Sequence, residues 1–274
     1  MYSFGPIPKQ KRSGHLIGTH QKIDRIARKH LSTLAGDRAE MFPHIRDILH
    51  FEGSRGPDGV KLKSPGKDEP RHFINPSDPD GELLEYIRHH SHNLSEAIAA
   101  ADTHRAAFEA AWLAHAVTDG LTPAHHDMYE AQLERLGHGE DISKVRHKMI
   151  LNGESSRQKI RNNWQYWGAK GIMTTHTLFE AGIAMAAKPY RFNSGLPSEH
   201  DIEALDHSGG FEEQYIRLVT EVASLDMYEA FKRTGWTSEL ARQTNRELLP
   251  RVIMAVTLSW YDALKNAKNI EVSS

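Results

Sequence analysis

The segment AHAVTDGLTPAHH carries the residues of this sequence that are best spaced to bind a metal ion. His115 and Asp119 lie four residues apart, which puts both side chains on one face of a helix. Gly120 and Pro123 predict the end of that helix, so that His125 can turn back over it. Imidazole and carboxylate groups suit zinc. On these residues alone, a hydrogen-bonded His115 in the core and a polar Asp119 at the helix end are an equal alternative.

A second pair with the same spacing, His176 and Glu180, lies in the strongly apolar segment THTLFEAGIAMA. Burying a histidine and a carboxylate on the apolar stripe of a helix costs free energy unless the two groups find partners. A metal ion is one such partner, and a buried ion pair between the two side chains is the alternative. The pair therefore favours a second metal site.

Three further candidates lie nearer the N-terminus. His20 opens the first expected helix in the segment GHLIGTH, with His15 nearby. Asp58 ends the segment GSRGPD, and His72 lies in RHFINP, both within a long loop. Each would be an ordinary residue in isolation, and it is their order along the chain that gives them weight.

Taken in order, these motifs resemble the zinc-dependent phospholipase C family, which is related to the S1/P1 nucleases. The series runs Gly-Thr-His, Gly-Pro-Asp, His-Phe, His-xxx-Asp-xxxxx-His and His-xxx-Glu, from His20 to Glu180. The C-terminal segment RVIMAVTLSWYDAL also resembles the closing helix of that family. The resemblance implies a zinc-dependent hydrolase that cleaves a phosphodiester bond.

The resemblance also implies a role for each candidate. The first zinc ion would be held by His115, Asp119, Asp58 and His72, the second by His125, His176 and Glu180, and a third by His20 with Asp119 bridging. Asp58 would in addition activate the attacking water, as both a ligand and the general base. The expected cofactor is therefore zinc, as two or three ions.

Two departures from the family pattern leave alternatives open. Secreted members use an N-terminal Trp at the third metal, whereas this chain begins Met-Tyr, so the third site is absent, weaker or built with His15. The interval between His125 and His176 is also long. The alternatives are His126 with Glu130 or His138 with Asp141 at the second metal, and His50, Glu52 or Asp68 in place of Asp58.

The composition narrows the possible chemistry. The chain has 274 residues, 18 histidines and no cysteine, so disulfides and thiolate zinc sites are excluded. Its formal net charge of -2 gives no overall basic field for nucleic acid, although a local basic cleft is compatible with it. Some histidines need no metal, since His89, His90 and His92 are expected in a solvated turn or at a helix end.

Helical periodicity predicts the elements that position these residues. Apolar stripes predict helices at 20–35, 82–101, 103–119, within 155–187, at 211–233 and at 237–268, with helix and loop mixed over 126–151. Loops are expected at 52–81 and 188–210, and no strand pattern is convincing. The expected fold is one compact all-α domain over residues 1–274, with the metal cluster in a cleft between helices.

The favoured substrate is a phospholipid headgroup, because Glu180 stands where the nucleases usually have Asp. Single-stranded nucleic acid or another small phosphodiester is the alternative, with Trp164, Tyr166 and Trp167 as stacking platforms for bases. A non-catalytic helical protein with a structural metal site is the second alternative. No signal peptide or membrane-spanning segment is evident, so a cytoplasmic location is expected, with secretion after processing as the alternative.

Overall fold

The computed structural model describes residues 18–63, 72–126, 155–188, 194–207 and 209–273. Its longer helices are α1 (Thr19–Ala35), α4 (Glu82–Ala99), α5 (Thr103–Gly120), α8 (Ser156–Trp167), α9 (Ile172–Ala187), α11 (Phe211–Ser224) and α14 (Leu249–Ser273). Its shorter helices are α2 (Ile45–Ile48), α3 (Pro57–Lys63), α10 (Glu199–His207), α12 (Met227–Thr234) and α13 (Ser238–Gln243). Within the described ranges, the extended pairing is one isolated bridge between Asn75 and Asp78.

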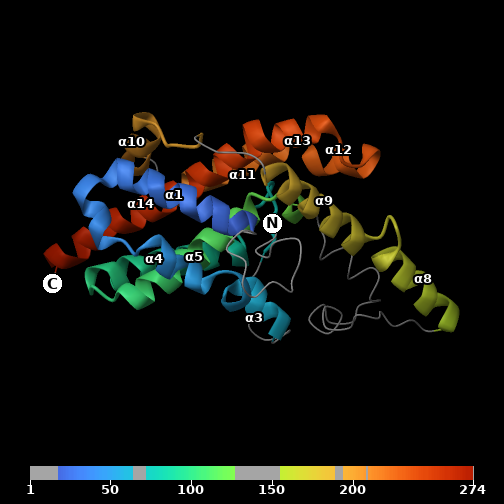
Figure 1. The fold of residues 1–274 in the computed structure, drawn as a ribbon, viewed down its shortest axis with the longest axis horizontal. Coiled ribbons are helices and arrows are strands. Elements are labelled where there is room, and N and C mark those ends of the chain that lie inside the picture. The colour runs from blue at the N-terminus through green and yellow to red at the C-terminus, as the bar shows by residue number, and fades with distance from the viewer. Residues whose placement is uncertain (1–17, 64–71, 127–154, 189–193, 208, 274) are drawn as a thin grey trace.

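The C-terminal helix α14 forms the centre of the bundle, where it packs against α1, α4, α5 and α11 (Figure 1). Its Trp260 is fully buried, and the indole nitrogen donates a hydrogen bond of 3.0 Å to the carbonyl of Ala110 in α5. Helix α5 faces its neighbours with small side chains such as Ala110 and Ala114, so the helices can approach closely. Each large apolar side chain buried here stabilises the fold by about 1.5–3 kcal/mol.

Helix α1 buries an apolar stripe with two polar residues embedded in it. Ile23, Ala27 and Leu31 are buried against the core, as the helical period predicts. His20 and Asp24 lie on the same buried stripe. The helix that anchors the N-terminal part of the bundle therefore also carries ionisable groups inward.

Two segments expected as loops contain helices. Residues 188–210 include α10, whose start is capped reciprocally: the Ser198 amide donates to the Asp201 carboxylate at 2.8 Å, and the Asp201 amide donates to the Ser198 hydroxyl at 3.2 Å. Leu205 anchors this short helix to the core. Residues 52–81 include α3, with a short 3-10 turn at 53–55 before it. Both helices are too short to produce a clear periodic pattern.

Two expected helical segments are interrupted. The helix expected within 155–187 is confirmed as α9, and α8 precedes it. In the tight turn between them, a Cβ at Gly171 would lie 2.5 Å from the Tyr166 carbonyl oxygen. The segment 211–233 breaks between α11 and α12, where Asp226 has a left-handed φ of 52°. The segment 237–268 is divided into α13, a π-helical turn at 244–248 and α14.

The histidines expected at a turn or helix end lie instead inside α4. His89 and His92 are exposed, as a solvated position implies. His90 is buried, and its Nδ1 forms a hydrogen bond with Glu109 of α5. This buried interhelical pair corrects the expectation for His90, because the helix turns that position toward α5.

The all-α, compact helical fold is confirmed by these residues. Helices 20–35, 82–101 and 103–119 are confirmed as α1, α4 and α5 to within two residues. The mixed segment expected at 126–151 lies outside the described residues apart from His126. In the part of the chain that the structure describes, no helix is long and apolar enough to span a membrane.

Candidate metal centre

Helix α5 provides the middle of the site. His115 and Asp119 lie one turn apart near its C-terminus, with His115 Nε2 3.2 Å from Asp119 Oδ2. Both side chains are almost completely buried, and Asp119 is reached by histidines from several elements. The predicted pair thus lies at the point where the surrounding helices converge.

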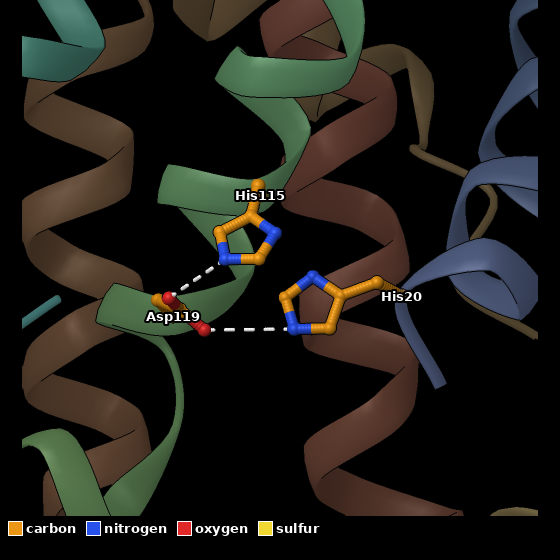
Figure 2. A group of neighbouring side chains, drawn as sticks. All are labelled: His20, His115 and Asp119. Carbon is orange, nitrogen blue, oxygen red and sulfur yellow. Dashed lines mark ion pairs between the residues drawn. The ribbon is translucent and has the colours of Figure 1, made fainter. Parts of the chain in front are cut away.

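Helix α1 contributes His20 from the other side. Its ring stacks on that of His115, with 4.3 Å between the ring centroids, and its Nε2 lies 3.5 Å from Asp119 Oδ1 (Figure 2). The two oxygens of Asp119 therefore face different histidines, Oδ1 toward His20 and Oδ2 toward His115. A carboxylate with its oxygens divided in this way has the geometry of a bridging ligand.

Two residues of the expected long loop reach the group formed by His20, His115 and Asp119. His72 forms a short hydrogen bond with Asp119 Oδ2 through its Nδ1. Asp58, in the first turn of α3, lies with its Oδ1 3.6 Å from His115 Nε2. The side chain of Asp58 is 26% exposed, whereas that of Asp119 is 3% exposed. Asp58 is therefore the carboxylate of this cluster that solvent can reach.

The end of α5 positions His125. The helix stops at Gly120, and a 3-10 turn (Pro123–His125) brings His125 back over it, as the two helix-stopping residues predicted. The His125 Nδ1 lies 2.9 Å from the carbonyl oxygen of Asp119, an acceptor, so Nδ1 carries the proton. The Nε2 atom is then left as the acceptor nitrogen, 3.1 Å from Glu180 Oε1. Such fixing of the tautomer is common for histidines that bind metals.

Helix α9 completes this second group. His176 Nε2 lies 3.5 Å from Glu180 Oε1, one turn further along the helix. The His176 ring stacks on that of His125 at 5.1 Å, with an interplanar angle of 10°. Phe73 covers both rings, with centroids 5.3 Å from His125 and 6.3 Å from His176. The aromatic cover and the stacked rings hold the potential ligand atoms in one place.

All eight residues singled out from the sequence lie in three neighbouring groups. They are His20 with His115 and Asp119; Asp58 with His72 and His115; and His125 with His176 and Glu180, the potential ligand atoms of each group lying within 4.8 Å of one another. The first two groups share His115. The chain thus brings together residues separated by up to 160 positions (20 to 180).

The chemistry of these donors fits metal ions. Both ring nitrogens of His115 are buried without a hydrogen bond among the described residues, although three carboxylates lie 3.2–3.7 Å away. Burial and the nearby His115 lower the pKa of His20 to about 3, and burial lowers that of His125 to about 4. Both rings are therefore neutral at pH 7, the form that binds metals.

The carboxylates of the site are ionised. Burial opposes ionisation of Asp58, but the neighbouring His115 holds the pKa of its carboxyl below the usual range. Burial likewise opposes ionisation of Glu180, yet the hydrogen bond with His176 helps to keep its pKa well below normal.

Burial opposes protonation of His115, but Asp119 and Asp58 beside it raise its pKa well above normal, so this ring would have to release a proton to bind a metal. The neutral rings of His20 and His125, together with the ionised carboxylates, are donors of the kind that zinc accepts.

Two buried carboxyls behind His115 complete the surroundings, and one of them gave no signal in the sequence motifs. Glu52 Oε1 lies 3.7 Å from His115 Nδ1, on the side of the ring away from Asp58. Asp24 lies near Glu52, and burial together with Glu52 raises its pKa well above normal. The available signal for Asp24 was its position: it follows Ile23 on the side of α1 that the apolar stripe buries.

The structure locates several of the alternatives. Glu52 and Asp58 approach different nitrogens of His115. His50 is exposed and hydrogen-bonded to Arg55, away from the cluster. His126 donates to the Gly120 carbonyl at 2.7 Å. His15, Asp68, Glu130, His138 and Asp141 lie outside the described residues.

The three aromatic residues proposed as stacking platforms are separated by burial. Trp164 and Trp167 of α8 are exposed, whereas Tyr166 is 7% exposed and belongs to the core. Tyr166 is therefore an ordinary core aromatic, because the helix turns it to the face opposite the two tryptophans.

Comparison with known proteins identifies the fold. No protein-family model matches the chain, and no curated protein matches its sequence. Among solved structures, the all-α fold is similar to the helical part of a bacterial toxin. That structure is the α-toxin of Clostridium perfringens from the avian strain SWCP, with a TM-score of 0.60 and 13% identity. The match covers 94% of this chain and 65% of the toxin chain, so this chain spans about two thirds of the toxin's length.

Proposed function

We propose that this chain is a zinc-dependent hydrolase of the phospholipase C type, which cleaves a phosphodiester bond. The observation that carries the proposal is the convergence of eight motif residues into three adjacent groups with ligand spacing. The shared fold with α-toxin supports it. A single structural site would use one closed set of four ligands, whereas adjacent groups sharing His115 favour a multinuclear centre.

The proposed ligands follow the three groups. One ion would be held by His115, Asp119, Asp58 and His72, a second by His125, His176 and Glu180, and a third by His20 with Asp119 bridging. When bound, zinc supplies charge for the phosphate oxygens and lowers the pKa of a coordinated water. The neutral rings of His20 and His125 offer lone pairs without prior loss of a proton.

Asp58 is the proposed general base. It is ionised at neutral pH, and its side chain is the more exposed of the two carboxylates that face His115 Nε2. An ionised carboxylate that water can reach is able to orient a nucleophile and accept its proton. Glu52 and Asp58 lie on opposite sides of the His115 ring and would hold it in place while Asp58 accepts the proton.

A phospholipid headgroup is the proposed substrate class. Glu180 supports it, because the resemblance places Asp at this position in the nucleases. The burial of Tyr166 removes one of the three platforms on which a nucleic-acid substrate would depend.

Metal content and hydrolysis test the proposal together. Purified wild type is expected to hold two or three zinc ions and to hydrolyse phosphatidylcholine, with phosphocholine as product. His115→Ala is expected to lose the zinc ion that His115 would hold, and to lose hydrolysis. His92→Ala, at an exposed histidine of α4, is the matched control and should retain both. Zero or one zinc ion in wild type, unchanged by His115→Ala, would refute the proposal and favour a non-catalytic protein.

A further inference from the structure

Helix α8 is oriented opposite to an ordinary surface helix. Its large apolar residues Ile160, Trp164 and Trp167 follow one another at intervals of four and three, so they lie on one face. Ile160 is 72% exposed, Trp164 71% and Trp167 42%. These three residues, called the α8 stripe below, thus face solvent, whereas the apolar face of a surface helix normally packs against the core.

The opposite face of α8 is turned inward and is largely polar. Asn162 and Tyr166 are the buried residues of the helix, and they lie one turn apart. Gln158, one turn before Asn162, is half-buried on the same side. Exposing two tryptophans and an isoleucine forgoes favourable free energy in water, because apolar area contributes only when it is removed from solvent. An apolar partner would reverse that balance.

The charges around the α8 stripe are of one sign. Arg157, Lys159, Arg161 and Lys170 are exposed, and residues 155–171 contain no Asp or Glu. The whole chain, by contrast, has 34 basic and 36 acidic residues. Around the helix axis, Arg157 and Arg161 lie on one side of the stripe and Lys159 on the other. The stripe is therefore flanked by cations on both sides.

From this arrangement, we propose that α8 docks onto an anionic lipid surface. Tryptophan is suited to the bilayer interface, an aliphatic side chain enters the acyl boundary, and flanking Lys and Arg bind anionic headgroups. The aliphatic Ile160 favours lipid over single-stranded nucleic acid, since bases stack on aromatic rings and not on isoleucine. The inference goes beyond the proposed hydrolase, because it concerns a surface outside the candidate metal centre.

Helix α8 is joined directly to α9, which carries two of the candidate ligands. Figure 1 shows α8 at one end of the molecule, beyond α9. The junction is tight, since the Gly171 amide donates to the Gly168 carbonyl at 2.7 Å and the Thr174 hydroxyl donates to the Trp167 carbonyl at 3.0 Å. His176 follows in the second turn of α9. The helix that would touch lipid is thus fixed to the helix that carries two candidate ligands.

Vesicle binding tests this inference with the full chain. Wild type is expected to co-sediment with mixed phosphatidylcholine–phosphatidylglycerol vesicles, less with pure phosphatidylcholine, and less at high salt. The variant I160S/W164S should bind the mixed vesicles at least about tenfold more weakly. The matched control M41S/M185S removes two apolar side chains that are 43% and 62% exposed elsewhere, and it should bind like wild type. Circular dichroism checks that both variants fold.

A charge exchange separates electrostatic from apolar attachment. R157E/R161E should weaken binding to the mixed vesicles by about tenfold, whereas R25E/R46E, at exposed arginines of other helices, should not. Equal binding of wild type and I160S/W164S would overturn the inference. So would the absence of vesicle binding, α8-dependent binding of a single-stranded oligonucleotide without vesicle binding, or a dimer that covers the α8 stripe.

Activity assays keep this inference separate from the proposed hydrolase. If both hold, I160S/W164S should hydrolyse a soluble phosphodiester like wild type but act more slowly on phosphatidylcholine in vesicles. If wild type binds vesicles through α8 and hydrolyses neither substrate, the docking surface stands and the proposed function fails.

Discussion

His115 is approached from behind by a carboxyl group that lies outside the proposed ligand set. Glu52 approaches the Nδ1 of this ring while Asp58 and Asp119 approach Nε2. Groups that orient a metal-binding histidine from behind typically contribute 10- to 100-fold in metal affinity. Glu52 is therefore a positioning residue for the proposed centre.

Glu52→Gln is expected to weaken zinc binding by about 10- to 100-fold, because the ring would lose its carboxyl partner while every residue of the proposed ligand set remains. Competition with a fluorescent zinc chelator measures the affinity. Glu40→Gln, at an exposed glutamate, is the matched control. Unchanged affinity in Glu52→Gln would show that Glu52 does not position His115.

A second residue-scale prediction lies away from the metal centre, in α14. Burial raises the pKa of Asp262 to about 6, while its oxygen accepts a hydrogen bond from Asn266 at 3.1 Å. A carboxyl with a raised folded-state pKa stabilises the fold below its unfolded pKa near 4 and loses that contribution as pH rises through 6. Asp262→Asn should therefore raise the free energy of unfolding by about 1 kcal/mol at pH 7.5, after allowance for solvent screening.

Urea unfolding at two pH values measures this effect. The difference between Asp262→Asn and wild type should disappear near pH 4, where the wild-type carboxyl is already neutral. The exposed Asp37→Asn should show no such pattern. An equal difference at both pH values would mean that ionisation of Asp262 is not the cause.

At the residue scale, the sequence could indicate the candidate site because its ligand types recur at fixed helical spacing. His115 with Asp119, and His176 with Glu180, required only the period of a helix. His20, Asp58 and His72 required the order of motifs in a known family. Asp24 belongs to no motif, and its position beside Glu52 depends on how α1 packs, which spacing does not encode.

At the scale of elements, the end of α5 is constrained by its contact with α11. A Cβ at Gly120 would overlap the Tyr215 hydroxyl and lie 2.8 Å from a methyl carbon of Leu83. Tyr215 is fully buried, and its hydroxyl lies 3.5 Å from the Val117 carbonyl. Glycine at this position lets the helix end lie against α11 while Asp119 stays in the cluster.

Gly120→Ala is expected to destabilise the protein by about 1–3 kcal/mol through overpacking. Tyr215→Phe removes the clashing hydroxyl and should cost about 1 kcal/mol alone. The double variant should then be more stable than the sum of the single effects predicts, as measured by denaturant unfolding. Strict additivity would contradict the clash.

Long helices with a clear apolar stripe could be predicted from the sequence, whereas short helices could not. Helices α1, α4 and α5 have long apolar stripes, and α5 also has Gly120 and Pro123 as stop signals. Helix α10 spans Glu199–His207, too few turns to establish a period, so its capping residues Ser198 and Asp201 were the stronger signal. The break before α9 depends on a close backbone approach at Gly171 that no period reveals.

At the scale of the whole molecule, bound zinc should stabilise the bundle as well as act in catalysis. The candidate ligands come from α1, α3, α5, α9 and the turns beside them, so ions would link elements that are otherwise held by packing. Chelation of the metals should lower Tm by about 10 °C, given a few kcal/mol of binding free energy. Calorimetry of wild type with and without chelator measures this shift.

His115→Ala provides the control for that shift. Because it disrupts two of the three groups, its Tm should respond to chelator much less than that of wild type. A wild-type Tm that is insensitive to chelator would mean that the ions do not link these elements.

The packing of α14 against α1 also affects the order in which the proposed centre can form during synthesis. Helix α14 includes the last residues that the structure describes, yet it contacts the helix that carries His20. While the chain emerges from a ribosome, the candidate ligands are all translated before the helix that packs α1 into place. The proposed centre can therefore reach its final geometry only after α14 has emerged and packed against α1, so ligands made early in synthesis wait for a helix that is translated after all of them.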